Sequence, residues 1–248
     1  MRFWLASGAI FALFLTGCGT AGQLYRLPYA DGVAVTITAD HEDHQTPPEK
    51  MFDMRASQPN QVLAAAAEGW VRFIKDTGDS SEPTNNYVWI EHPLDYCQPL
   101  EPVLGGAPQR GQGEDCRTCP DGVGKCNEWT VYAHMAQDSV RAAPPLGAGL
   151  SENDWVNAGQ AIGIEGDVGF TPCPPSTAGQ PLCGRHVHFA VFQIDRDTQA
   201  AQLTPTDEGD YEPYADIFGR TELVPTFCTA DGLRAPDTGD THVAGPCP

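Results

Sequence analysis

Turn-forming residues interrupt this sequence so often that long helices have little room to form. The 248 residues include 26 Gly and 22 Pro, and both residue types mark turns and loops between regular elements. The runs between these interruptions are short and rich in β-branched and aromatic residues, as strands are. They cover residues 33–38, 51–55, 61–65, 70–74, 87–91, 130–134, 155–164 and 186–193. The sequence therefore predicts a mainly β protein, an antiparallel sheet or sandwich with few short helices.

Two of these runs, residues 87–91 and 130–134, alternate in polarity as half-buried strands do. Hydrophobic residues make up 41% of the chain, which is enough for one core. We expect one main domain over residues 25–195, with an insertion at residues 95–128. Residues 196–248 turn polar and Pro-rich, and we expect them to form a C-terminal extension packed on that domain.

The charge balance restricts the partners of the protein. The chain has 14 Lys and Arg against 33 Asp and Glu, a formal net charge of −19. An anionic surface repels phosphate groups, so binding to nucleic acid through charge neutralisation is excluded. A basic patch for anionic lipid headgroups is missing for the same reason.

The N-terminus resembles the export signal of bacterial lipoproteins. Arg2 precedes an uncharged, mostly apolar run from Phe3 to Leu15, which is shorter than the roughly 20 residues that span a bilayer. The sequence Leu15-Thr-Gly-Cys18 then resembles a lipobox, which implies cleavage after residue 17, lipidation of Cys18 and a tether over residues 18–24. Because Gly19 stands where inner-membrane lipoproteins often carry Asp, we expect attachment to the outer membrane, facing the periplasm. The alternative is an ordinary secretory signal.

Eight further cysteines indicate an oxidising compartment. They are Cys97, Cys116, Cys119, Cys126, Cys173, Cys183, Cys228 and Cys247. The even number predicts disulfides that stabilise loops, and we expect local pairing of Cys173 with Cys183 and of Cys228 with Cys247. The spacing of Cys116, Cys119 and Cys126 leaves a zinc knuckle as the alternative.

Two histidines share one face of a predicted strand. In a strand, alternate residues point the same way, so His186 and His188 lie about 7 Å apart on one face while Val187, Phe189 and Val191 occupy the other. Two imidazoles on an otherwise apolar strand need a polar partner, and a zinc ion with its water would supply one. The alternative is a pair of surface histidines on an exposed strand.

Two weaker signals come earlier in the chain. His134 stands in the strand-like segment Val131-Tyr-Ala-His-Met135, and His44 precedes Asp53 by nine positions. Taken alone, each signal is also common among histidines and carboxylates that have no catalytic or metal-binding role. Their value lies in their order along the chain.

The order of these motifs resembles the lysostaphin/LytM-type zinc endopeptidases, bacterial enzymes that cut peptide cross-links of peptidoglycan. The resemblance spans roughly residues 25–193. It includes Leu27-Pro-Tyr29, the segment Gln61-Val-Leu-Ala-Ala-Ala-Ala-Glu-Gly-Trp70, Val156-Asn-Ala-Gly-Gln-Ala-Ile-Gly163 and the closing His186-Val-His-Phe189. The resemblance implies a mostly antiparallel β fold with an open groove and one catalytic Zn²⁺ at the floor of the groove.

The same resemblance implies a role for each candidate residue. His44, Asp53 and His188 would be the zinc ligands, which leaves a fourth position for water, as a catalytic zinc requires. His134 and His186 would stand beside that water as general acid and base, in an order that the sequence leaves open. His41 is a rival to His44 as a ligand. His92 and His242 match no motif, and we expect them on the surface.

These implications predict a zinc metalloendopeptidase acting on peptidoglycan cross-links, expected to be a monomer held at the membrane by its lipid anchor. A catalytically silent relative that binds peptidoglycan or activates another hydrolase is the first alternative. A disulfide-stabilised lipoprotein with purely structural histidines is the second, and cleavage of Gly-rich proteins by the same chemistry is the third. The insertion at residues 95–128 could cover the groove or narrow the range of substrates.

Overall fold

The computed structural model describes residues 24–43, 50–79, 85–92, 126–169, 184–195, 220–229 and 232–247. These ranges contain strands and no helix, which confirms the predicted mainly β class. The strands are β1 (Leu24–Arg26), β2 (Ala34–Ala39), β3 (Met51–Ala56), β4 (Val62–Ala64), β5 (Gly69–Lys75), β6 (Tyr87–His92), β7 (Cys126–Ala133), β8 (Trp155–Val156), β9 (Ala161–Ile164), β10 (Val187–Asp195), β11 (Arg220–Leu223), β12 (Thr226–Thr229), β13 (Gly232–Arg234) and β14 (Thr241–Val243).

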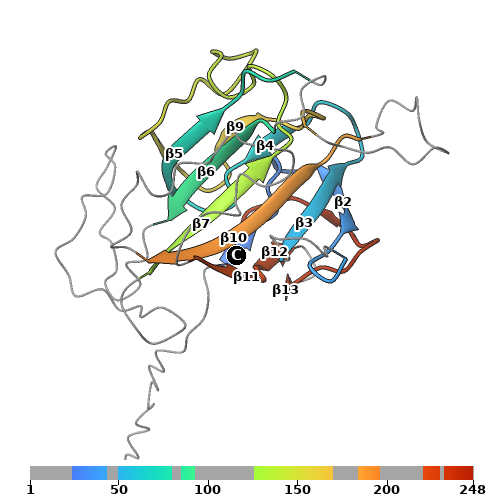
Figure 1. Ribbon diagram of the computed structural model, residues 1–248. Helices are drawn as coiled ribbons and strands as arrows, with labels where there is room; N and C mark the ends of the chain where they lie inside the picture. The colour runs from blue at the N-terminus through green and yellow to red at the C-terminus, as the bar shows by residue number, and fades with distance from the viewer. Residues whose placement is uncertain are drawn as a thin grey trace, which may run out of the picture.

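Nine strands form the main sheet, in the order β14-β2-β3-β10-β7-β6-β5-β8, with β11 also paired to β10. All pairs in this sheet are antiparallel. The long strand β10 lies at its centre, between β3 and β7 (Figure 1). One edge of β10 pairs with β7 from His188 to Asp195, and its other edge pairs first with β3 and then with β11. The centre of the sheet therefore joins three segments that are distant in the sequence.

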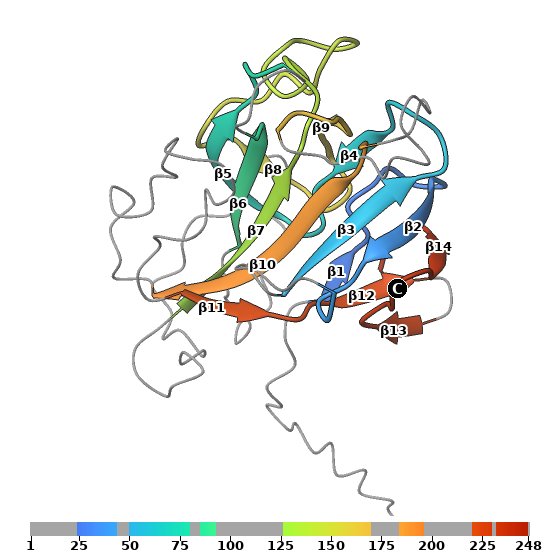
Figure 2. The same ribbon diagram turned by 45° about the vertical axis from the view of Figure 1, so that its right-hand side comes forward.

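The C-terminal strands are built into the fold. Strand β14 extends the main sheet by pairing with β2, and β12 pairs in parallel with β1 in a three-stranded sheet with β13. In Figure 2 these strands, coloured red, lie beside the blue N-terminal strands. The predicted disulfide between Cys228 and Cys247 is present. The other disulfide candidates have side chains outside the described residues.

The centre of the main sheet is buried on both faces. Val187, Phe189 and Val191 of β10 belong to one apolar cluster, whereas Ala190 and Phe192 belong to another on the opposite face. All residues of β6 are buried, as are residues 127–133 of β7. The expectation of half-buried strands at residues 87–91 and 130–134 is therefore wrong, because apolar clusters form against both faces.

The predicted strand at residues 155–164 is two strands in two sheets. Strand β8 pairs with β5 at the end of the main sheet, and β9 pairs with β4 in a separate two-stranded sheet. A turn separates them, closed by a hydrogen bond from the Gln160 N–H to the Asn157 carbonyl. Gly159 takes φ +83° in this turn, and the Arg26 guanidinium occupies the space that a Cβ would need. The expectation of one strand is therefore wrong, because Asn157 and Gly159 are turn-forming residues inside that run.

His92 and His242 are buried, so the expectation that they lie on the surface is wrong. His92 donates its Nδ1–H to the Glu68 carbonyl at 2.7 Å and accepts the Thr130 hydroxyl at Nε2, at 2.8 Å. His242 Nε2 lies 3.5 Å from a carboxylate oxygen of Asp240. Local polar partners therefore make both buried rings structural.

Burial lowers the pKa of His92 from its ordinary value of 6.5 to about 4, although Glu128 and Glu91 act in the opposite direction. Unfolded chains therefore take up this proton first as the pH falls. We expect the free energy of unfolding to drop by about 3 kcal/mol between pH 6.5 and 4, with no further loss from this group below that range. His92→Gln can make both hydrogen bonds without titrating. Urea denaturation should show that its stability falls less over this window; equal slopes for both proteins would contradict the assignment.

The N-terminal prediction concerns residues outside the described ranges, which include Cys18 and the apolar run before it. Within the residues that the structure describes, no helix has the length and apolar character of a membrane span.

Candidate metal centre

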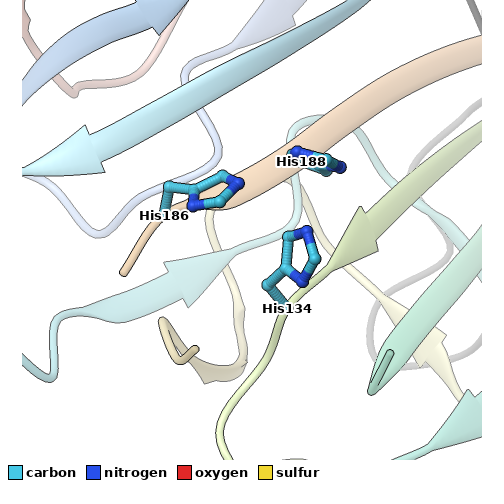
Figure 3. Close-up of side chains that lie close together, drawn as sticks. All are labelled: His134, His186 and His188. Carbon is cyan, nitrogen blue, oxygen red and sulfur yellow. The ribbon is translucent and has the colours of Figure 1, made fainter. Parts of the chain in front are cut away.

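Four of the predicted site residues meet where β3, β7 and β10 lie side by side. Asp53 of β3 and His188 of β10 are directly opposite each other in the strand register. His134 follows the last residue of β7, and His186 precedes the first residue of β10. Figure 3 shows the three imidazoles facing one another from these two segments.

The distances within this group are short. His188 Nε2 lies 2.7 Å from Asp53 Oδ1, and His186 Nε2 lies 3.8 Å from Asp53 Oδ2. The ring centroids of the three histidines are separated by 4.2, 4.6 and 4.7 Å. Each ring offers a nitrogen within 4.8 Å of those of the other two, a spacing at which one metal ion can be held.

Backbone carbonyls determine which nitrogen two of the rings present to the cluster. His134 Nδ1 lies 2.7 Å from the Val168 carbonyl oxygen, and His186 Nδ1 lies 2.9 Å from that of Gly184. A carbonyl only accepts hydrogen bonds, so both Nδ1 atoms carry a proton, and in a neutral ring Nε2 keeps its lone pair. Hydrogen bonds of this kind orient metal-binding and catalytic histidines.

His134 has the most constrained environment of the group. Its side chain is buried, and its Nε2 has no hydrogen-bond partner among the described residues. Burial, reinforced by the neighbouring His188 and His186, holds the pKa of His134 well below its ordinary value, so the ring is neutral at neutral pH. Its backbone has φ +61°, a left-handed conformation that costs a side-chain-bearing residue about 1–2 kcal/mol. Strain of this kind concentrates at functional sites.

A buried carboxyl group anchors β3 behind the cluster. Glu165 Oε1 accepts a hydrogen bond from the Ala56 N–H at 3.0 Å and lies 2.8 Å from the Tyr29 hydroxyl. That hydroxyl donates to the Met54 carbonyl, next to Asp53, at 2.7 Å. Burial raises the pKa of Glu165. The sequence did not predict the contact between Glu165 and Tyr29, because neither of these two residues belongs to a motif with a known ligand spacing.

The first predicted ligand is not tested by this geometry. His44 lies outside the described residues. The ring of its rival His41 lies 5.7 Å from that of Phe52, and Phe52 belongs to the apolar cluster on the face of β3 opposite to Asp53. His41 therefore packs away from the four gathered side chains.

The residues present suit a divalent cation such as zinc. Imidazole nitrogens and carboxylate oxygens are zinc ligands, and the buried Nε2 of His134 is a polar atom that needs a partner. The set predicted for zinc and the group of three histidines have His188 in common. The predicted set adds His44 and Asp53 to it, whereas the group of three adds His134 and His186.

No family model matches the chain, and no curated protein matches it. Several solved structures are similar to it, among them these three. A zinc containing peptidase from Vibrio cholerae is 15% identical, with 68% of this chain and 36% of that one covered and a TM-score of 0.36; this chain thus spans about a third of its length. Pseudoalterin, a deep-sea M23 metalloprotease, is 13% identical, with 91% and 98% covered and a TM-score of 0.38.

The catalytic domain of lysostaphin from Staphylococcus simulans is 14% identical, with 70% of this chain and 85% of that one covered and a TM-score of 0.32. The resemblance itself rests on the motifs and on the site. Four side chains that follow the order of the motifs along the sequence gather at one place in the fold. In its motifs and in this cluster, the chain is similar to the lysostaphin/LytM-type (M23) zinc endopeptidases.

Proposed function

We propose that this protein is a zinc metalloendopeptidase that hydrolyses peptide bonds in peptidoglycan cross-links. The observation that carries the proposal is the convergence of Asp53, His134, His186 and His188 from three strand segments, with short distances between their polar atoms. A purely structural role does not require three imidazoles and a carboxylate to converge with an unpartnered, buried nitrogen among them.

Asp53 and His188 would hold the zinc ion, with His44 as the third ligand. Zinc bound in this way lowers the pKa of water and polarises the scissile carbonyl group. A ligand set of two histidines and one carboxylate is typical of catalytic rather than structural zinc.

His134 and His186 would carry the proton transfers. Each ring donates its Nδ1–H to a backbone carbonyl and directs Nε2 to the cluster. One ring would accept the proton of the attacking water at Nε2, and the other, when protonated at Nε2, would donate that proton to the leaving amine. Because burial keeps His134 neutral, its lone pair is available at neutral pH.

We also propose that the enzyme is a lipoprotein of the outer membrane. The support is the short apolar run that ends at Leu15-Thr-Gly-Cys18. In bacteria fed radiolabelled palmitate, the chain should become labelled and the Cys18→Ser variant should not. Equal labelling of both would contradict lipidation of Cys18.

The proposed activity is tested with the purified chain and isolated cell-wall sacculi. We expect about one zinc ion per chain by elemental mass spectrometry, and release of cleaved cross-links that mass spectrometry of the digest identifies. A chain that binds sacculi and leaves them intact would support the silent relative. A chain that binds no zinc, and whose folding a chelator does not change, would support structural histidines. If the chain cleaves a Gly-rich protein and leaves sacculi intact, the substrate is a Gly-rich protein instead of peptidoglycan.

A further inference from the structure

The strained backbone of His134 needs support from outside its own strand. His134 has φ +61°, and the chain turns away from β7 at this residue. A non-glycine residue keeps such a conformation only where its neighbours hold it. The contacts around this turn include one group on Met135 and one on the Val168 carbonyl.

The first group comes from Asn86, which is fully buried just before β6. Its side-chain Nδ2 donates to the Met135 carbonyl at 3.3 Å, and its backbone carbonyl accepts a hydrogen bond from the Met135 N–H at 3.3 Å. The same side-chain amide is fixed in turn by Gly78, whose carbonyl and N–H lie 2.8 and 2.9 Å away. Asn86 therefore holds both polar backbone groups of the residue after His134.

The second group depends on Gly169. Its neighbour Val168 provides the carbonyl that accepts the His134 Nδ1–H at 2.7 Å. Gly169 has φ +93°, and a Cβ there would lie 1.8 Å from Asn85 Oδ1. That oxygen has no hydrogen-bond partner among the described residues, so Asn85 meets Gly169 through packing alone. A methyl group at residue 169 would have to displace the Asn85 side-chain amide, next to the peptide bond that carries the Val168 carbonyl.

We propose that Asn86 and Gly169 are positioning residues for His134. Asn86 holds the turn that carries the ring, and Gly169 lets the Val168 carbonyl reach Nδ1. The inference rests on the proposed function for its effect on turnover, but the position and tautomer of the ring can be measured without it. Neither residue touches the reacting groups, so both act through His134.

Gly169→Ala tests the second contact, and the chain offers a matched control. Gly239 has nearly the same φ, +91°, but open space where a Cβ would stand. With a purified cross-linked muropeptide as substrate, we expect Gly169→Ala to lower kcat about 100-fold, with unchanged zinc content and KM. Gly239→Ala should leave kcat within about twofold of the wild type, since it carries the backbone strain without the clash.

A double variant shows whether the clash with Asn85 is the cause. Asn85→Ala removes the oxygen nearest to the added Cβ, so Asn85→Ala/Gly169→Ala should recover at least about tenfold of the lost kcat. No recovery, or an equal loss of kcat in Gly239→Ala, would overturn the proposed role of Gly169.

The tautomer of His134 gives a readout that needs no activity. In metal-free protein with ¹⁵N-labelled histidine, NMR should show the Nδ1–H form for His134 in the wild type and Gly239→Ala, and a mixture in Gly169→Ala. Asn86→Asp, in which a carboxylate replaces the donor to Met135, should perturb the same signal; Asn86→Ser serves if that variant does not fold. Unchanged signals in Gly169→Ala and in the folded Asn86 variant would overturn the proposal. If the wild type shows no turnover but the variants show these NMR changes, only the proposed function is refuted.

Discussion

His134→Ala and His186→Ala are each expected to retain zinc and lose turnover. Removing a general acid or base costs about 10²–10⁴-fold in rate, and both rings direct Nε2 into the cluster from backbone-fixed positions. Elemental analysis should find the zinc content of the wild type in both variants, while release of cleaved muropeptides falls to near background. The loss should appear in kcat, because the substrate still meets an intact metal site.

His41→Ala is the matched control for these two variants. It removes a ring that packs against Phe52 on the other side of β3, so turnover and zinc content should stay within about twofold of the wild type, as for a substitution outside the site. Loss of zinc in His41→Ala would make that residue a ligand in place of His44. Loss of zinc in both His134→Ala and His186→Ala would identify the three histidines as the metal-binding set.

Asp53→Ala and His188→Ala are expected to lose the metal itself. The two side chains lie 2.7 Å apart on directly paired residues of β3 and β10. Each substitution therefore removes one proposed ligand and leaves the other in place. A site with two remaining ligands should bind zinc at least about 100-fold more weakly, since even loss of an outer-shell partner costs about 10–100-fold. Competition with a chromogenic chelator measures this affinity, and turnover should fall with zinc occupancy.

Asp53→Asn separates charge from shape at the same position. The amide keeps the size of the carboxylate but supplies a neutral and weaker oxygen ligand, so we expect an affinity between those of the wild type and Asp53→Ala. Near-UV circular dichroism of the metal-free variants should match the wild type. Full zinc occupancy in His188→Ala would show that the proposed ligand assignment is wrong.

The strands of the sheet centre were predictable because their signal is local. β-branched and aromatic residues alternate with turn residues around β2, β3, β5, β6 and β10, and period-two alternation alone places His186 and His188 on one face. The short C-terminal strands were missed. β12 and β13 lie in a polar, Pro-rich segment, and the pairing of β12 with β1 is a contact across about 200 residues that no local pattern encodes.

Which histidines are buried could also be learned only from the folded chain. The sequence near His92 and His242 does not separate a buried ring from an exposed one. Both hydrogen-bond partners of His92 are distant in the sequence, and β14, which carries His242, pairs with the distant strand β2. The same holds for Glu165, and for the Val168 and Gly184 carbonyls that orient the site histidines. Backbone carbonyl groups are chemically alike at every position. The sequence therefore cannot indicate which carbonyl will accept the hydrogen bond of a given histidine.

The sequence by itself determined the β class, the pairing of Cys228 with Cys247 and the side chains available for metal chemistry. Each follows from residue type and short spacing, which act within a few residues of chain or across one short loop. Only the tertiary structure decided that Asp53, His134 and His188 meet, because their approach depends on the register of three strands whose pairing the whole core stabilises. It also decided the left-handed turn at His134 and the contacts that hold it.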